Sequence, residues 1–178
     1  DLYPYYGNTP SRRDAEAVDR AMHTAQLDAL RMRVLDTTSG GEQQRTHIAR
    51  TFTQVDNNAP GPRLLLLDEP LNDLDIRHQH ALMDAAKSFA KEGHCVLAVL
   101  HDVNMAAQYA DRILLMNAGR ITASGVPDDV LTAPILSEAY GLAARVMPHP
   151  CHACPLVFFD GSPKQTNTAG VQDQNHNA

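Results

Sequence analysis

The stretch LLLLDEP, residues 64–70, joins an apolar run to two adjacent carboxylates. Four consecutive leucines bounded by turn residues predict a short strand that is buried on both faces of a sheet. Asp68 and Glu69 follow directly, and neighbouring carboxylates cannot be buried unpaired without a large desolvation cost. We therefore expect the strand to end at a crevice, where a cation could share the two side chains.

A second apolar run predicts the neighbouring strand. Residues 94–102 read HCVLAVLHD, and residues 75–93 between the two runs have apolar side chains at helical spacing. Two strands joined by a helix imply a parallel βαβ unit, so the predicted fold is α/β, with a parallel sheet flanked by helices. Because ligands bind at the carboxyl ends of such strands, we expect His101 beside Asp68 and Glu69.

Hydrophobic periodicity and turn residues predict the other elements. They are an amphipathic helix at 11–32, a helix starting at the glycines 40 and 41, a loop at 55–62, a short helix at 103–111, a hairpin at 112–125, two short helices at 127–133 and 134–141, and a final strand within 145–159. From residue 161 onward almost nothing can be buried, so 161–178 is predicted to be a disordered tail.

Length and composition limit the classes of function that this chain could have. A chain of 178 residues with 43% hydrophobic residues fits one domain with a core. A formal net charge of −6 disfavours a nucleic-acid surface. Every apolar run falls well short of the about 20 residues that span a bilayer. Three cysteines do not form a disulfide framework, so a reducing cytoplasm is the default compartment.

The residues before the helix at 40 predict an anion site. Ser39 and Glu42 have the S-x-x-E spacing of a capping box. Unpaired backbone N–H groups at a helix start attract anions, and Gly40 and Gly41 allow a phosphate to approach the backbone closely. A simple helix cap is the common structural explanation of this pattern. A phosphate site is indicated only when other groups of such a site are found elsewhere in the sequence.

The two carboxylates at the strand end predict a metal ligand and a general base to accompany this anion site. Mg²⁺ prefers hard oxygen ligands and keeps several waters while it holds substrate phosphates. Asp68 is then the metal-side carboxylate, and Glu69 remains to polarise a water for attack. His101 could donate a hydrogen bond to a γ-phosphate or orient that water. The order and types of these groups together are more specific than any one of them.

Together these motifs resemble those of ABC-transporter ATP-binding subunits. TSGGEQQR at 38–45 is similar to the signature motif, LLLLDEP to Walker B with its catalytic glutamate, LNDLD at 71–75 to the D-loop, and His101 to the switch histidine. The resemblance implies the C-terminal part of an ABC-type P-loop NTPase domain over residues 1–160. Its implied parts are a helical signature region at 10–60, a Walker B to switch-histidine core at 61–125, and C-terminal helices and a strand at 126–160.

The resemblance also implies roles for individual residues. Two such domains close head to tail on two ATP molecules with Mg²⁺. Asp68 would bind the metal, and Glu69 and His101 would be catalytic at the subunit's own site. The nucleotide-binding residues would be Ser39, Gly40, Gly41, Glu42 and Asp75, with Asp75 linking the two sites. Thr38 replaces the usual leucine of the signature, and Asn72 and Asp73 replace the usual small residues of the D-loop.

A Walker A motif is not found in the sequence. The pattern G-x-x-x-x-G-K-[ST] is needed because its lysine reaches the β- and γ-phosphates. Ala86, Ala90 and Pro163 precede the three lysines, so no lysine follows a glycine. We therefore expect the N-terminal Walker A portion and the Gln-loop to be absent from this chain, which would be a fragment of a cassette and inactive alone.

Longer segments resemble one group of importers. DEPLNDLDIRHQHALM at 68–83 and HDVNMAAQYADRILLMNAGRI at 101–121 are similar to ATPases that import iron complexes and cobalamin, above all to haem-import subunits. This implies ATP hydrolysis that drives haem uptake at the cytoplasmic face of the bacterial inner membrane. The implied partners are a second copy, permease subunits and, indirectly, a periplasmic binding protein, but no nucleic acid.

Several alternatives stay open. The cargo could be a ferric siderophore or cobalamin. An SMC-like ATPase half would explain the missing Walker A, but it would need heptad coiled coils and a basic face. A non-hydrolysing regulatory subunit is a further alternative. HPCHACP at 149–155 places Cys151 and Cys154 near two histidines at metal-like spacing, which leaves regulatory haem or metal binding open, although a second Cys pair is missing.

Overall fold

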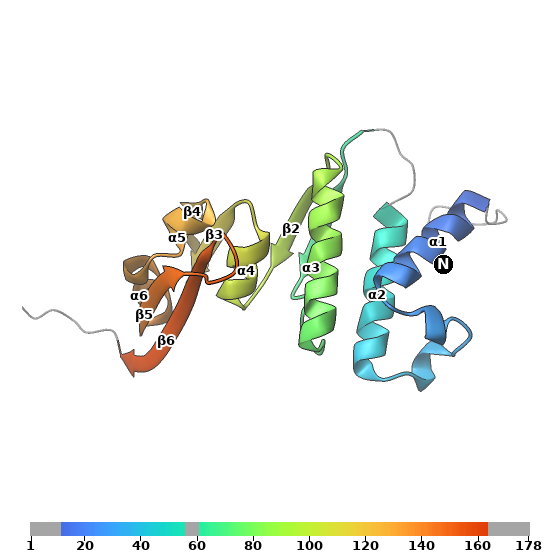
Figure 1. The fold of residues 1–178 in the computed structure, drawn as a ribbon, viewed down its shortest axis with the longest axis horizontal. Helices are drawn as coiled ribbons and strands as arrows, with labels where there is room; N and C mark the ends of the chain where they lie inside the picture. The colour runs from blue at the N-terminus through green and yellow to red at the C-terminus, as the bar shows by residue number, and fades with distance from the viewer. Residues whose placement is uncertain (1–11, 56–60, 164–178) are drawn as a thin grey trace, which may run out of the picture. The chain divides into compact units, whose positions relative to one another are not determined.

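The computed structural model describes residues 12–55 and 61–163 (Figure 1). The chain divides into two compact units, Asp1–His101 and Asp102–Ala178, and each is described by itself. Most of the predicted loop at 55–62 and the predicted tail beyond 163 lie outside the described residues. No helix in the described ranges has both the length and the apolar character needed to cross a membrane.

The first unit packs helices against a two-stranded parallel sheet. Its elements are α1 (Arg12–Thr24), the 3-10 helices η1 (Asp28–Leu30) and η2 (Leu35–Thr37), α2 (Gly40–Val55), β1 (Leu64–Asp68), α3 (Ile76–Lys91) and β2 (Cys95–Val99). In the parallel register, Leu66 lies opposite Leu97 and Asp68 opposite Val99. The predicted α/β class and βαβ unit are confirmed.

The first helix ends earlier than its sequence pattern predicts. Gln26 has a φ of 55°, a left-handed conformation that breaks the helical ladder. The chain turns there and brings Leu27, which is 2% exposed, into a cluster with Ala21 and Ala49. The helix predicted over 11–32 is therefore wrong beyond Thr24, because burial of Leu27 outweighs local helix propensity.

The sheet is buried on one face only. The buried cluster joins the strands to α2 and α3 through Leu65, Leu67, Phe52, Val55, Ala86 and Phe89. On the other face, Leu64 and Leu66 are 55% and 61% exposed. The prediction of strands buried on both faces is therefore wrong for the described residues, because both helices that pack on the sheet contact the face of Leu65 and Leu67.

The helix between the strands, Ile76–Lys91, lies within the predicted range of 75–93. Asp75 precedes α3 and accepts a hydrogen bond from the His78 N–H at 3.0 Å, which caps the helix. Beyond its end, Gly93 has a φ of 90°, a conformation that suits glycine. Both ends of the helix are therefore set by local residues that the sequence shows directly.

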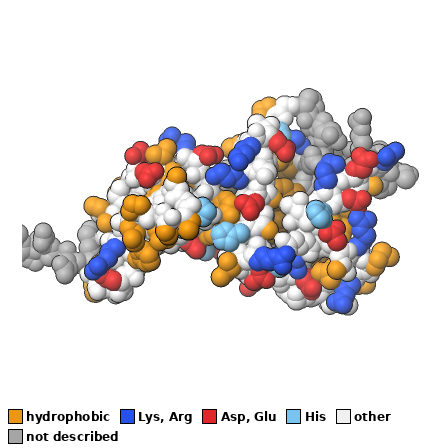
Figure 2. All heavy atoms as spheres, viewed as in Figure 1, with side chains coloured by type: hydrophobic (Ala, Val, Ile, Leu, Met, Phe, Trp, Pro, Cys, Tyr) orange, Lys and Arg blue, Asp and Glu red, His pale blue; other side chains and the backbone are white. Residues whose placement is uncertain are grey.

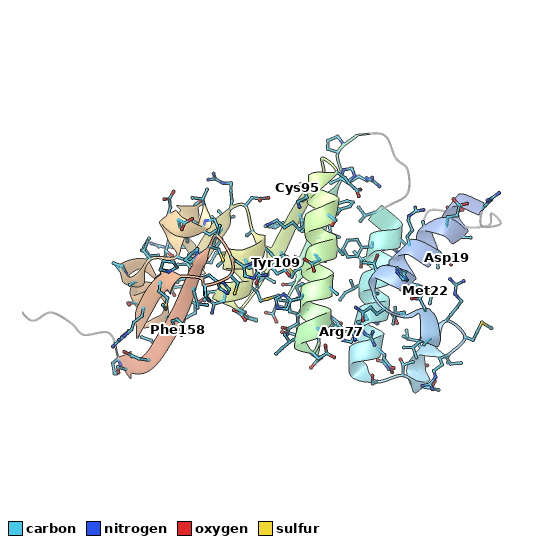
Figure 3. The ribbon with its side chains drawn as sticks, in the orientation of Figure 1. Asp19, Met22, Arg77, Cys95, Tyr109 and Phe158 are labelled. Atoms are coloured by element: carbon cyan, nitrogen blue, oxygen red, sulfur yellow. The ribbon has the colours of Figure 1, made fainter. Side chains whose placement is uncertain are left out.

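The second unit is built from short helices and two antiparallel hairpins. Its elements are α4 (Val103–Tyr109), β3 (Ile113–Asn117), β4 (Arg120–Gly125), α5 (Pro127–Val130), α6 (Ala133–Tyr140), β5 (Leu142–Pro148) and β6 (Pro155–Pro163). Its core contains Val130, Leu131 and Leu136, each at most 1% exposed. Hydrophobic side chains also remain at its surface, among them Phe158, which is 48% exposed (Figures 2 and 3).

The end of this unit differs from its prediction. Two strands, β5 and β6, replace the single strand predicted within 145–159, and Gly161–Pro163 belongs to β6 rather than to a disordered tail. The chain turns back at 149–154, where the His149 N–H donates to the Cys154 carbonyl at 3.0 Å. The predicted hairpin at 112–125 is confirmed as β3 and β4.

Candidate functional site

The carboxyl ends of β1 and β2 meet at one edge of the sheet. Asp68 is the last residue of β1, and Glu69 follows it. His101 lies two residues beyond β2, and its Nε2 is 2.8 Å from Oε1 of Glu69. The expected meeting of Glu69 and His101 is therefore confirmed. Because a carboxylate can only accept, Nε2 of His101 holds the proton in this contact.

Glu69 is held by two donors. The side-chain amide of Asn72 donates to Oε2 at 2.8 Å, while His101 occupies Oε1. The hydrogen bond from Asn72, and then the hydrogen bond and charge of His101, hold the pKa of Glu69 below its ordinary value of 4.5. Glu69 is therefore an oriented carboxylate at neutral pH, which suits a general base.

The backbone of Glu69 adopts a conformation that is uncommon for this residue type. Its φ is 46°, in the left-handed region. The N–H of Asn72 donates to the Glu69 carbonyl at 3.3 Å and closes the turn after the strand. Non-glycine residues in this region cluster at functional sites, where the surrounding contacts maintain the strain.

Asp68 is the carboxylate at this edge that suits a metal. Its side chain is exposed at the strand end, whereas both oxygens of Glu69 accept hydrogen bonds. An aspartate oxygen is the hard ligand that Mg²⁺ prefers. Within 12–55 and 61–163, no group of three or more His, Cys, Asp or Glu side chains is arranged to hold a metal. Mg²⁺ on Asp68 would therefore also need phosphate and water oxygens.

The start of α2 forms the predicted capping box. The Ser39 N–H and hydroxyl donate to Oε2 of Glu42 at 2.7 and 2.9 Å, and the Glu42 N–H lies 3.4 Å from the Ser39 hydroxyl. These bonds, first that from the Ser39 backbone, lower the pKa of Glu42 from 4.5. A Cβ added at Gly40 would have nothing within 4 Å, so the backbone there is open to a ligand.

The loop of residues 71–75 lies against the same helix. A Cβ added at Gly41 would lie 3.1 Å from the carbonyl oxygen of Asp73, so glycine permits a close approach between the two segments. Asp75 caps α3, and the backbone and ring hydrogen bonds from His78 lower its pKa below 3.8. The predicted site residues thus form two clusters, one at the strand edge and one at the start of α2.

Sequence reasoning missed three participants. Asn72 orients Glu69, and Arg45 and His78 connect α2 to Asp75. The Asp75-x-x-His78 spacing is typical of a helix cap and could have indicated one of these contacts. Arg45 and His78 are 33 positions apart in the sequence, and no local sequence pattern predicts that they meet in the fold.

A metal centre at 149–155 finds no support in the described residues. Nδ1 of His149 accepts hydrogen bonds from the N–H groups of Cys151 and His152, each at 3.1 Å. No group of three metal-binding side chains is arranged around a common point in the described ranges. The metal-like spacing of this segment has a structural explanation, a hairpin loop whose turn His149 stabilises.

Comparisons with known proteins agree with these motifs. A family model described as ABC transporter matches residues 5–72. The hemin import ATP-binding protein HmuV of Gloeobacter violaceus is 44% identical over 160 residues, covering 89% of this chain and 58% of that protein. The HmuV of Hahella chejuensis is 44% identical over 157 residues, covering 86% of this chain and 59% of that protein.

The chain is similar to ABC transporter ATP-binding proteins over most of its length. It spans 58% and 59% of the lengths of these two ABC relatives. A solved metal-chelate-type ABC transporter in an inward-facing conformation has the same fold, with a TM-score of 0.66 and 23% identity over 86% of this chain and 59% of that chain. A solved ATP-binding subunit of an ABC transporter gives a TM-score of 0.58 and 25% identity over 70% of this chain and 49% of that chain. The resemblance to ABC ATP-binding subunits is confirmed.

Proposed function

We propose that the chain supplies the signature, Walker B, D-loop and switch-histidine parts of an ATPase subunit that drives haem import across the bacterial inner membrane. The observation that supports it most directly is the 2.8 Å contact between Glu69 and His101 at the sheet edge. The 44% identity to hemin import ATP-binding proteins favours haem among the possible cargoes.

Glu69 and His101 act on the water in this proposal. Glu69 is deprotonated at neutral pH, and Asn72 fixes one of its oxygens, so the carboxylate can take a proton from a water as that water attacks the γ-phosphate. His101 orients the carboxylate through Nε2–H. Asp68 would hold Mg²⁺, which when bound supplies positive charge to the phosphates.

The start of α2 receives the nucleotide of the second copy. The open backbone at Gly40 and the close approach at Gly41 present N–H groups to a γ-phosphate. Glu42 accepts from both the N–H and the hydroxyl of Ser39 in the capping box, so a phosphate would have to displace Glu42 from these donors. Asp75 lies at the D-loop end, where it would connect the two ATP sites of a head-to-tail dimer.

The proposal includes the partners and location of such a subunit. A second copy completes each ATP site, permease subunits receive the conformational change, and a periplasmic binding protein delivers cargo to them. The subunit would then lie peripherally at the cytoplasmic face of the inner membrane. Ferric siderophore or cobalamin is the alternative cargo.

The experiment measures ATP hydrolysis and haem uptake by the polypeptide of the complete reading frame that contains this chain, assembled with its permease. We expect Glu69→Gln to lower kcat at least about a hundredfold, because the base is lost, with little change in ATP affinity. Glu92→Gln, at the exposed end of α3, is the matched control and should keep full activity.

Other outcomes separate the alternatives. Hydrolysis that responds to a ferric siderophore or cobalamin, and not to haem, would show that the cargo is one of these compounds. The site assignments would stay unchanged. Full hydrolysis in Glu69→Gln would contradict the proposal. ATP hydrolysis by the 178-residue chain alone would contradict our prediction that this chain is inactive without a Walker A motif.

A further inference from the structure

The imidazole of His78 lies between two charged side chains from different elements. His78 is in the first turn of α3, next to Arg77, which Figure 3 labels. Its Nδ1 is 2.8 Å from Oδ1 of Asp75, and its Nε2 is 2.9 Å from Nη1 of Arg45 on α2. The side chain of His78 is only 19% exposed, so water has limited access to the ring.

These two contacts determine the protonation of the ring. The guanidinium of Arg45 has donors and no acceptor, so Nε2 of His78 must accept the hydrogen bond. The remaining proton is then on Nδ1, which donates to the carboxylate of Asp75. His78 is therefore neutral in this arrangement. A second proton, on Nε2, would place an N–H donor of the ring against an N–H donor of Arg45, and a positive ring against the positive guanidinium.

The contacts join three segments of the first unit. Nη1 of Arg45 also donates to the carbonyls of Ala25 and Gln26, at 3.2 and 3.0 Å, just after α1. Asp75 caps α3, so a chain of polar contacts runs from the end of α1 through α2 to the D-loop. Gly41 lies one helical turn before Arg45 and contacts the D-loop backbone at Asp73.

The hollow beside the ring has few titratable lining residues. A hollow of about 20 Å³ adjoins the ring, and Arg45 and His78 are its titratable lining residues. α1 contributes Ala21 and Thr24 to it, which are uncharged. Asp75 is a further charged group in contact with the ring. Arg45 and Asp75 thus give the two ring nitrogens different roles, one as acceptor and one as donor.

We propose that His78 is a positioning residue whose neutral form holds the signature helix to the D-loop. This inference rests on the proposed function. With the contacts intact, the phosphate-binding start of α2 and the D-loop move together, so both align on nucleotide at once. When the ring can no longer accept from Arg45, the two segments separate, and kcat falls while ATP affinity changes little.

The first test measures the tautomer in the 178-residue chain. Long-range ¹H–¹⁵N correlation spectra at pH 8 should show His78 protonated at Nδ1 and unprotonated at Nε2. Most exposed histidines prefer the other tautomer, so this result is specific to the contact. A proton on Nε2 at pH 8 would overturn the proposal, whatever the activity of the protein.

The second test compares two variants of the complete reading frame's polypeptide. His78→Gln keeps an acceptor near the position of Nε2 and cannot be protonated. His78→Asn keeps a donor near the position of Nδ1 and loses the acceptor for Arg45. We expect His78→Asn to lower kcat about tenfold with KM within about twofold. His78→Gln, which keeps the acceptor for Arg45, should keep about half of the kcat.

The controls separate this proposal from the proposed function. His47→Gln, an exposed position on α2, should leave kcat and KM unchanged. If both His78 variants have the parent's kcat, the positioning role is wrong and the proposed function stands. If the parent protein shows no ATP hydrolysis, the proposed function and the positioning role both fall, while the spectra still decide the tautomer.

Discussion

At the scale of single residues, the two clusters have one feature in common: a glutamate in each is already bound by neighbours of its own chain. Glu69 accepts from Asn72 and His101, and Glu42 accepts from Ser39. These bonds keep the carboxylates ionised and oriented before a ligand arrives. They also mean that a phosphate approaching α2 must compete with Glu42 for the Ser39 N–H.

The pKa of Glu69 provides a direct check. Asn72→Ala removes the main cause of its depression, so the pKa should rise toward 4.5, as carbon NMR of the carboxyl group would measure. A group with a lowered folded pKa stabilises the fold fully above its unfolded value and loses that contribution as the pH falls through the folded one. The stabilisation from Glu69 is therefore present above about pH 4.5 and is lost below it.

The control for this measurement is Gln44→Ala, which removes a side-chain amide on α2 rather than in the turn that contains Asn72. It should leave the Glu69 titration unchanged. An unchanged titration in Asn72→Ala as well would show that the Asn72 contact is not formed in solution.

At the scale of elements, the order of helices and strands follows from the sequence, but their extents and faces depend on packing. The caps at Asp75 and Ser39 and the turn near Gly119 are local and were predictable. The end of α1 depends on burial of Leu27, and the exposure of Leu64 depends on which helices cover the sheet. The pairing of Arg45 with His78 likewise requires the tertiary arrangement.

Phe52 of α2 connects three hydrophobic clusters of the first unit. Its ring meets that of Phe89 edge to face, with centroids 6.4 Å apart. We expect Phe52→Ala to lower the free energy of unfolding by about 3 kcal/mol, near the low end for buried aromatics because the side chain is partly exposed. Urea unfolding followed by circular dichroism measures this change.

The matched control is Phe158→Ala on β6, where the side chain is 48% exposed. Its effect should be about 1 kcal/mol or less. Equal losses in the two variants would contradict the central role of Phe52 in joining the clusters.

At the scale of the whole molecule, the chain consists of two compact units with separate cores. The candidate site residues all belong to the first unit, Asp1–His101. The motifs predicted the similarity to ABC ATP-binding proteins and the meeting of Glu69 with His101. A division after His101 could not be predicted, since nothing in the composition changes at that point.

Separate cores imply separate local stabilities. Leu136 is fully buried in the second unit, so we expect Leu136→Ala to cost about 3 kcal/mol there. Amide hydrogen exchange should show that protection falls mainly at residues after His101. A matching loss of protection across α2 and α3 would show instead that the chain unfolds as one cooperative unit.

The exposed leucines of the sheet have a practical consequence for anyone who purifies this chain. Leu64, Leu66, Leu97 and Val99 form an apolar surface on a two-stranded sheet, and each is at least half exposed. Such a surface promotes aggregation, and apolar attraction weakens on cooling. Cold, dilute buffers will therefore keep preparations clear, whereas warming and concentration will make them turbid.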